Sequence, residues 1–69
     1  MSKLKINTPY ITLQQLLKIE NIISSGGEAK YYLVDNDVLV NDELERRRGR
    51  KLYPGDIIKV YNDTFIIEW

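Results

Sequence analysis

The chain has 69 residues, and its ten lysine and arginine residues are matched by ten aspartate and glutamate residues, so it is neutral overall at pH 7. Folding at this length buries only about 60% of the surface that an unfolded chain exposes, so we expect one domain, residues 1–69, with a small stability margin. Because cysteine and histidine are absent, the composition excludes disulfides, the usual zinc sites and nucleophile pairs built on histidine.

The pattern of apolar residues does not resemble that of a membrane or exported protein. No apolar stretch approaches the roughly 20 residues that cross a bilayer. Residues 1–10 lack the apolar middle of a signal peptide. Together with the absence of cysteine, this pattern predicts a soluble cytoplasmic protein without a membrane partner.

The first predicted elements are a strand and a helix. Residues 3–6 alternate charged and apolar side chains, which is typical of a strand with one face on the core. Thr12 offers a capping hydroxyl, and Gln15 three residues later completes a capping box at a helix start. Asn21 is expected to end this helix in the left-handed conformation. The apolar stripe of the helix is predicted to consist of Leu13, Leu16 and Leu17.

A second helix is predicted directly afterwards, so that the two helices meet at a tight corner. Ser24 or Ser25 can cap it, and Glu28 stands three residues beyond Ser25 as the reciprocal partner of a second capping box. The residues expected to face the core are Ala29, Tyr32 and Leu33.

Two glycines occupy the first turn of this second helix. Gly26 and Gly27 are poor helix formers, so their presence suggests that something packs or binds against bare backbone there. A phosphate fits the positive end of a helix, and Lys30 lies one turn along. The alternative is that the glycines only permit close helix packing.

Beyond the helices the pattern changes to that of a sheet. Residues 38–40 form a β-rich run between the turn signals Asp35-Asn36-Asp37 and Asn41-Asp42. Residues 53–56 have proline and glycine at the two central positions of a type II turn. Two further strands, residues 57–61 and 64–69, are predicted around a hairpin turn at Asn62-Asp63.

The aromatic residues of this part are assigned to the core side. Phe65, Ile67 and Trp69 are expected on one side of the last strand, with Trp69 as an apolar lid on the sheet. The tyrosines interpreted as core or core-rim residues are Tyr10, Tyr53 and Tyr61.

A basic run interrupts the predicted sheet. It holds five of the ten basic residues within six positions: Arg46, Arg47, Arg48, Arg50 and Lys51. Pooling like charge in a neutral chain causes repulsion, which a bound polyanion relieves, and phosphate is the leading candidate. Arginine favours this reading because its planar fork binds two phosphate oxygens or stacks on a base.

The surroundings of the basic run indicate how it is held. Gly49 inside it is expected to allow a positive φ or a close approach to a ligand. Leu44 and Leu52 bracket the run as apolar anchors, which favours a pinned loop. The alternative is a solvated, disordered charge run.

Four blocks follow one another along residues 22–60: Ser25-Gly26-Gly27-Glu28-Ala29-Lys30, Val38-Leu39-Val40-Asn41, Arg47-Arg48-Gly49-Arg50-Lys51-Leu52 and Pro54-Gly55-Asp56. This series resembles the S-four domain, the RNA-binding domain named after small-subunit ribosomal protein four. More narrowly it is similar to the stand-alone bacterial YaaA-type form. The resemblance covers nearly the whole chain, and the ordered series is more specific than any one block.

The resemblance implies an α+β fold with an αL RNA-binding motif, in which two helices pack at a corner on a small antiparallel sheet. It also implies RNA contacts from the helix starts and the following β-loop. On this chain these positions are Thr12, Gln14, Gln15, Ser25, Gly26, Gly27, Lys30 and Asn41, with the five basic residues of the run.

Three other positions bear on that implied surface. Tyr31 can stack on a flipped-out base if it faces the same way as Lys30, and packing at the sheet edge is the alternative. Asn36 and Asp42 stand where the family often has glycine. Both residue types tolerate the left-handed region, but Asp42 adds an acidic group beside the surface.

The leading hypothesis is a non-catalytic, monomeric RNA-binding protein that contacts structured RNA, above all ribosomal RNA, in ribosome assembly or maintenance. We expect no cofactor, no metal and no small-molecule substrate. The hypothesis depends on guanidinium groups held in a fixed concave array, and it fails if they are splayed apart or tied up pairwise with neighbouring carboxylates.

Three other functions compete with RNA binding. A protein-interaction module could dock an acidic partner protein on the same arginines. DNA binding is weaker because no predicted helix carries the basic residues that enter a major groove. An enzyme is the weakest, because the carboxylates lie on turns, where they are normally solvated, and no pairing with a nucleophile is visible.

Overall fold

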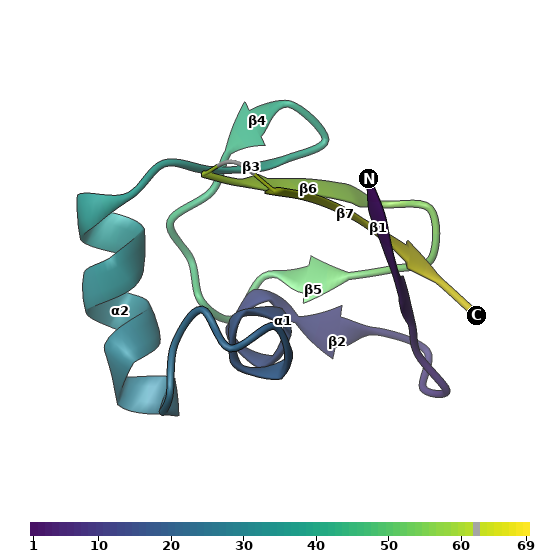
Figure 1. Cartoon of the computed structure of the whole chain (residues 1–69), viewed down its shortest axis with the longest axis horizontal. Coiled ribbons are helices and arrows are strands. Elements are labelled where there is room, and N and C mark those ends of the chain that lie inside the picture. Colours follow the sequence, from purple (N-terminus) through teal and green to yellow (C-terminus); the bar gives the residue numbers. More distant parts are fainter. Residues whose placement is uncertain (62) are drawn as a thin grey trace.

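The computed structural model describes residues 1–61 and 63–69. Within them, α1 (Leu13–Ile19) and α2 (Gly26–Asp35) lie on one side of a five-stranded sheet, together with a small two-stranded sheet (Figure 1). In spatial order the larger sheet contains β1 (Ser2–Lys5), β7 (Asp63–Glu68), β6 (Ile57–Val60), β3 (Val38–Val40) and β4 (Glu43–Leu44). The smaller sheet pairs β2 (Ile11–Thr12) with β5 (Lys51–Leu52).

The larger sheet is antiparallel except at one edge. There β1 pairs with β7 in parallel, with Leu4 opposite Ile67. The alternation of residues 3–6 predicted a strand but carries no information about its direction or its partner. The α+β architecture is as predicted, and the parallel edge is an addition to it. No helix among the described residues is long and apolar enough to cross a bilayer.

Local capping fixes both ends of α1. The Thr12 hydroxyl accepts from the Gln15 N–H at 3.2 Å, and Gln15 Oε1 accepts from the Thr12 N–H at 2.7 Å, which confirms the capping box. At the other end Asn21 has a φ of 59°, and its N–H donates to Lys18 O at 3.0 Å. The Ile22 N–H donates to Leu17 O at 2.9 Å, which completes a Schellman motif and turns the chain toward α2.

The start of α2 differs from the prediction. Ser25 is the N-cap residue, but its side chain makes no capping hydrogen bond. Instead the Ser24 hydroxyl donates to the Glu28 carboxylate, so the predicted capping box between Ser25 and Glu28 is wrong. The Glu28 N–H is satisfied by Ser25 O at 3.2 Å, which removes the need for the hydroxyl. Asp35 belongs to α2, so the predicted turn begins one residue later, at Asn36.

The core lies between the larger sheet and the two helices. Leu13, Leu16 and Leu17 are fully buried, as predicted, and so are Ala29 and Leu33 of α2. Tyr32 is half-buried and packs against this core, also as predicted. The remaining core residues come from the strands and their connections: Ile6, Ile11, Ile23, Val38, Val40, Leu52, Ile58, Val60, Phe65 and Ile67.

Two aromatic residues are more exposed than the sequence predicts. Trp69 is 67% exposed because β7 ends at Glu68, so it is not a lid on the sheet. Tyr61 is 85% exposed and has a φ of 52°, which takes its backbone out of strand geometry, so β6 ends at Val60. Of the predicted hairpin turn, Asn62 lies outside the described residues and Asp63 begins β7.

The type II turn at residues 53–56 is confirmed. The Asp56 N–H donates to Tyr53 O at 2.9 Å, and Gly55 has a φ of 98°. The Asp56 carboxylate also accepts from the Tyr53 N–H at 2.8 Å, so Tyr53 is held at both its backbone polar groups. This turn joins β5 to β6 at a fixed angle.

Replacement of the cap at α1 tests how strongly that helix start supports the fold. Thr12→Ala leaves the Gln15 N–H without its acceptor, and we expect the free energy of unfolding to fall by about 1 kcal/mol. Thr12→Ser keeps the hydroxyl and should cost much less. Urea unfolding followed by circular dichroism measures both variants. Equal loss in the two variants would show that the threonine methyl, rather than its hydroxyl, matters.

Candidate nucleic-acid interface

The basic run forms a loop between β4 and β5 that is fastened to the start of α1. The Leu13 N–H donates to Arg50 O at 2.9 Å, and the Gln14 N–H donates to Arg48 O at 3.0 Å. With Gln15 bound by the Thr12 hydroxyl, the first-turn N–H groups of α1 are satisfied within the protein. The start of α1 therefore holds the loop backbone and offers no open anion site, and the alternative of a disordered charge run is wrong.

A buried carboxylate is the second anchor of this loop. Glu45 is only 5% exposed, and it accepts from Arg47 Nε at 2.9 Å and from Arg47 Nη2 at 3.0 Å. Arg50 Nη1 donates to the same carboxylate at 2.7 Å, and the backbone N–H of Arg47 donates at 3.1 Å. The hydrogen bond from the Arg47 side chain is the main cause that lowers the pKa of Glu45 to about 2, against the opposing effect of burial.

These contacts correct two expectations about the basic run. Leu44 is 52% exposed, so it is not an anchor; Glu45 and the buried Leu52 hold the loop instead. The guanidinium groups are also not all free, because Arg47 and Arg50 share one carboxylate. The sequence predicts that the carboxylates on turns are solvated; Glu45 differs because contacts across the fold bury it, and local sequence does not reveal them.

Arg46 has a separate role in the fold. Its Nη1 donates to Leu33 O at 2.8 Å and to Val34 O at 3.2 Å, and its Nη2 lies 3.5 Å from Asp37 Oδ1. These carbonyls belong to the last turn of α2, where a cation is favourable. Arg46 therefore ties the loop to the end of α2, and its guanidinium is already engaged there.

The tip of the loop is a turn from Arg47 to Arg50. The Arg50 N–H donates to Arg47 O at 3.2 Å, with Arg48 and Gly49 between them. Gly49 does not have a positive φ, so of the two expectations for it only a close approach to a ligand remains. A Cβ placed on Gly49 meets no atom within 4 Å, which leaves the backbone open to a close approach from outside. Arg48 has no acidic partner among the described residues, and its side chain is exposed.

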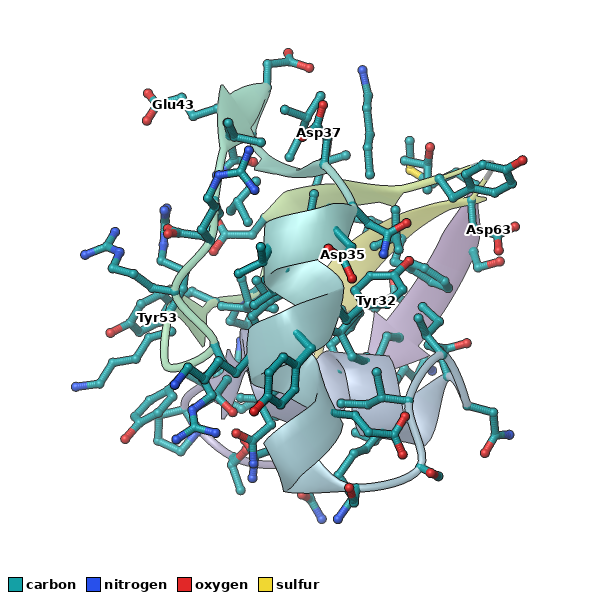
Figure 2. All side chains as sticks on the ribbon, turned by 90° about the vertical axis from the view of Figure 1, so that its left-hand side faces the viewer. Tyr32, Asp35, Asp37, Glu43, Tyr53 and Asp63 are labelled. Atoms are coloured by element: carbon teal, nitrogen blue, oxygen red, sulfur yellow. The ribbon has the colours of Figure 1, made fainter. Side chains whose placement is uncertain are left out.

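Two tyrosines that the sequence predicts as core or core-rim residues lie exposed beside this loop. The ring centroids of Tyr10 and Tyr53 are 5.8 Å apart, and Lys51 Nζ lies 4.9 Å from the Tyr10 centroid. An open hollow of about 480 Å³ is lined by Arg47, Gly49, Arg50, Lys51 and Tyr53. In Figure 2, Tyr53 lies at the left-hand edge of the molecule among side chains that end in nitrogen, while the labelled Glu43 and Asp37 lie at the top.

The two glycines at the start of α2 have different surroundings. A Cβ on Gly26 would lie 2.5 Å from Gln14 Nε2, so Gly26 permits the Gln14 side chain of α1 to pack against α2. A Cβ on Gly27 meets nothing within 4 Å, so packing does not account for the second glycine. Lys30 and Tyr31 are exposed on the same helix, and Tyr31, at 69% exposure, is not packed at the sheet edge.

Asn41 is committed to the fold rather than to the loop. Asn41 and Asp42 have φ values of 52° and 68° and form the turn between β3 and β4. The Asn41 side chain donates to Asp56 Oδ1 at 3.0 Å and accepts from the Ile57 N–H at 2.9 Å. The Asp42 carboxylate lies 3.0 Å from Lys59 Nζ, so its charge is paired. Asn36, by contrast, is extended, with a φ of −133°, so no left-handed residue is needed there.

Comparisons with known proteins find a similar sequence and a similar fold. A Bacillus subtilis (strain 168) protein described as "Probable ribosome maturation protein RlbA" is 53% identical over 57 residues, which are 83% of this chain and 80% of that protein. The solution structure of YbcJ from E. coli, described as having an αL motif involved in RNA binding, matches with a TM-score of 0.72. It is 24% identical, and the match covers 100% of this chain and 89% of YbcJ. This structural similarity confirms the predicted α+β fold with an αL motif.

The family assignment rests on nearly the full length of the chain. The model of the S4 domain, which is the S-four domain named above, matches residues 4–68. This range contains both helices, the basic loop and the strands from β2 to β7. The chain therefore belongs to the S4 domain family, as the four sequence blocks predicted.

Proposed function

We propose that this protein is a non-catalytic RNA-binding protein that contacts structured RNA, above all ribosomal RNA, in ribosome assembly or maintenance in the cytoplasm. The observation that carries the proposal is the basic loop, fastened to the start of α1 and to Glu45 by hydrogen bonds. Membership of the S4 domain family supports it, as does the relative described as a probable ribosome maturation protein. We propose that it acts as a monomer.

The pairing of arginines with Glu45 reduces the positive charge of the loop without cancelling it. Arg47, Arg48, Arg50 and Lys51 bring four positive charges, and Glu45 brings one negative charge. Three positive charges therefore remain on a short segment. Because the Arg47 side chain is 76% exposed although it binds Glu45, its outer N–H groups still face solvent and can donate to phosphate.

The proposed contacts divide into two groups by their role. The first group is engaged within the fold: Thr12, Gln14, Gln15 and Arg46 position the loop, and Asn41 fixes the turn between β3 and β4. The exposed part of the α2 start and the loop itself face solvent and contact RNA directly. This second group is Ser25, Gly27, Lys30, Tyr31, Arg47, Arg48, Arg50 and Lys51, while Gly26 packs against Gln14.

The salt dependence of RNA binding tests the proposed role of the loop. Each neutralised phosphate contributes roughly 0.7 to 0.9 to the slope of log affinity against log salt, so three net charges predict a slope of about 2 to 3. Arg48→Ala should weaken binding and lower that slope by about 0.7 to 0.9. Fluorescence anisotropy with labelled ribosomal RNA fragments, transfer RNA and duplex DNA measures both quantities.

Lys5→Ala is the matched control for Arg48→Ala. It removes the same charge from β1, at the edge of the sheet opposite β4. A slope near zero, or equal losses in the two variants, would remove the basis for RNA binding by the loop. Equal affinity for all three nucleic acids would contradict a preference for ribosomal RNA.

Acid titration tests Glu45 as an anchor of the loop. Glu45→Gln removes a charged acceptor from Arg47 and Arg50, and we expect the free energy of unfolding at pH 7 to fall by about 1 to 3 kcal/mol. Because folding lowers the pKa of Glu45 from 4.5 to about 2, its contribution is complete above about pH 4.5 and is lost as the pH falls toward 2.

The stability gap between the native protein and Glu45→Gln should therefore narrow between pH 4.5 and pH 2. Urea unfolding of both proteins across this range gives the gap directly. A gap that stays constant with pH would mean that the charge of Glu45 does not stabilise the loop.

Gly27 tests whether RNA approaches the start of α2. Since its Cβ position is open and its φ is not positive, Gly27→Ala should raise the free energy of unfolding by about 0.5 to 1 kcal/mol. If a phosphate lies against this backbone, the same change should weaken RNA binding, and we expect about fivefold, or roughly 1 kcal/mol. Thermal unfolding and anisotropy separate the two effects. Unchanged affinity in the more stable variant would place RNA away from α2.

A further inference from the structure

The register of the small sheet places two tyrosines and a lysine on one face. Ile11 pairs with Leu52 and Thr12 pairs with Lys51, so the antiparallel register brings Tyr10 opposite Tyr53. Ile11 and Leu52 point into the core. Because side chains alternate along a strand, Tyr10, Lys51 and Tyr53 share the opposite, outward face, which explains the close approach of the two rings.

This outward face continues into the hollow beside the basic loop. The hollow of about 480 Å³ is bounded by Tyr53 and Lys51 from the small sheet and by Arg47, Gly49 and Arg50 from the loop. Tyr53 is presented by a rigid turn, since both its N–H and its carbonyl are bonded to Asp56. An exposed aromatic ring, several cationic groups and bare glycine backbone therefore meet at one place.

We propose that this hollow binds one unpaired nucleobase, stacked on the ring of Tyr53, while Arg47 and Lys51 bind the phosphates on either side of it. The proposal rests on the proposed RNA binding and specifies the class of RNA. Within a duplex the faces of a base are covered by its neighbours, so a ring can stack only on a nucleotide that is bulged, looped or single-stranded. The target is then a helix interrupted by an unpaired nucleotide.

The chemistry of the hollow makes this recognition independent of base identity. Every base has a flat face, so stacking tolerates all four bases, and cations bind phosphate whatever the sequence. Tyr10 supports the arrangement from behind: its ring packs on Tyr53 at an interplanar angle of 50°, and Lys51 lies over it. Glu45 keeps Arg47 and Arg50 beside the hollow.

Three RNA hairpins with the same stem test the proposal. One stem is uninterrupted, one carries a central bulged nucleotide, and one carries the same bulge as an abasic nucleotide. Stacking of one base contributes enough that the native protein should bind the bulged hairpin about 5- to 150-fold more tightly than its abasic form. Anisotropy titrations give this ratio, which does not depend on the fraction of protein that is folded.

Two variants of Tyr53 locate the effect. Tyr53→Phe keeps the ring and should keep the ratio, whereas Tyr53→Ala should reduce it to nearly one while both hairpins still bind through the loop. Should Tyr53→Ala fail to fold, NMR of the native protein replaces it. The ring protons of Tyr10 and Tyr53 should then shift with the bulged hairpin and much less with the abasic one.

The outcomes separate this inference from the function on which it rests. Equal binding of the bulged and abasic hairpins, with losses in Arg48→Ala, would overturn the base pocket and leave RNA binding in place. A ratio that survives in Tyr53→Ala, or ring protons that do not respond, would also overturn it. Failure of all three hairpins to bind would remove both the pocket and the RNA-binding function.

Discussion

A single buried carboxylate organises the basic surface of this protein. Glu45 binds both Arg47 and Arg50, and it lies where the chain leaves the β3–β4 hairpin and turns down toward the helices (Figure 1). Without an acceptor there, two guanidinium groups would repel each other across a short turn. With Glu45 present, both guanidinium groups are attracted to the same carboxylate. The backbone between Arg47 and Arg50 is then fixed by Glu45 and by the start of α1.

The second anchor uses groups that a helix start otherwise leaves unsatisfied. The N–H groups of Leu13 and Gln14 are directed at carbonyls of the loop, so the positive end of α1 supports backbone rather than ligand. This arrangement couples the loop to the most buried part of the molecule, because Leu13, Leu16 and Leu17 fix the position of α1 in the core. The stability of α1 and the geometry of the basic loop therefore depend on one another.

Features set by nearby residues were predicted well from the sequence. The capping box of Thr12 and Gln15, the left-handed Asn21 and the type II turn at Gly55 each depend on at most four consecutive residues. Their local chemistry is sufficient to fix them. The apolar stripe of α1 was equally readable, because helical periodicity repeats within seven residues.

Features set by contacts far along the chain were missed, and they are the ones that shape the candidate site. The pairing of β2 with β5 joins residues about 40 positions apart through strands of two residues, which are too short to show alternation. The sequence therefore predicts Tyr10 and Tyr53 as core or core-rim residues, whereas that pairing brings them together on the surface. Arg46 was grouped with its neighbours by charge, whereas its contacts to Leu33 and Val34 give it a structural task.

The side chains of the basic run differ in whether they hold the loop or only add positive charge to it. The loop is held by Glu45 together with Arg46, Arg47 and Arg50, so changes at these positions alter its geometry as well as its charge. Arg48 has no acidic partner among residues 1–61 and 63–69, so it contributes only to the strength of attraction, whereas Lys51 also lies over the Tyr10 ring and lines the hollow. Affinity for a polyanion can therefore change at Arg48 while the hollow beside Tyr53, which Arg48 does not line, keeps its form.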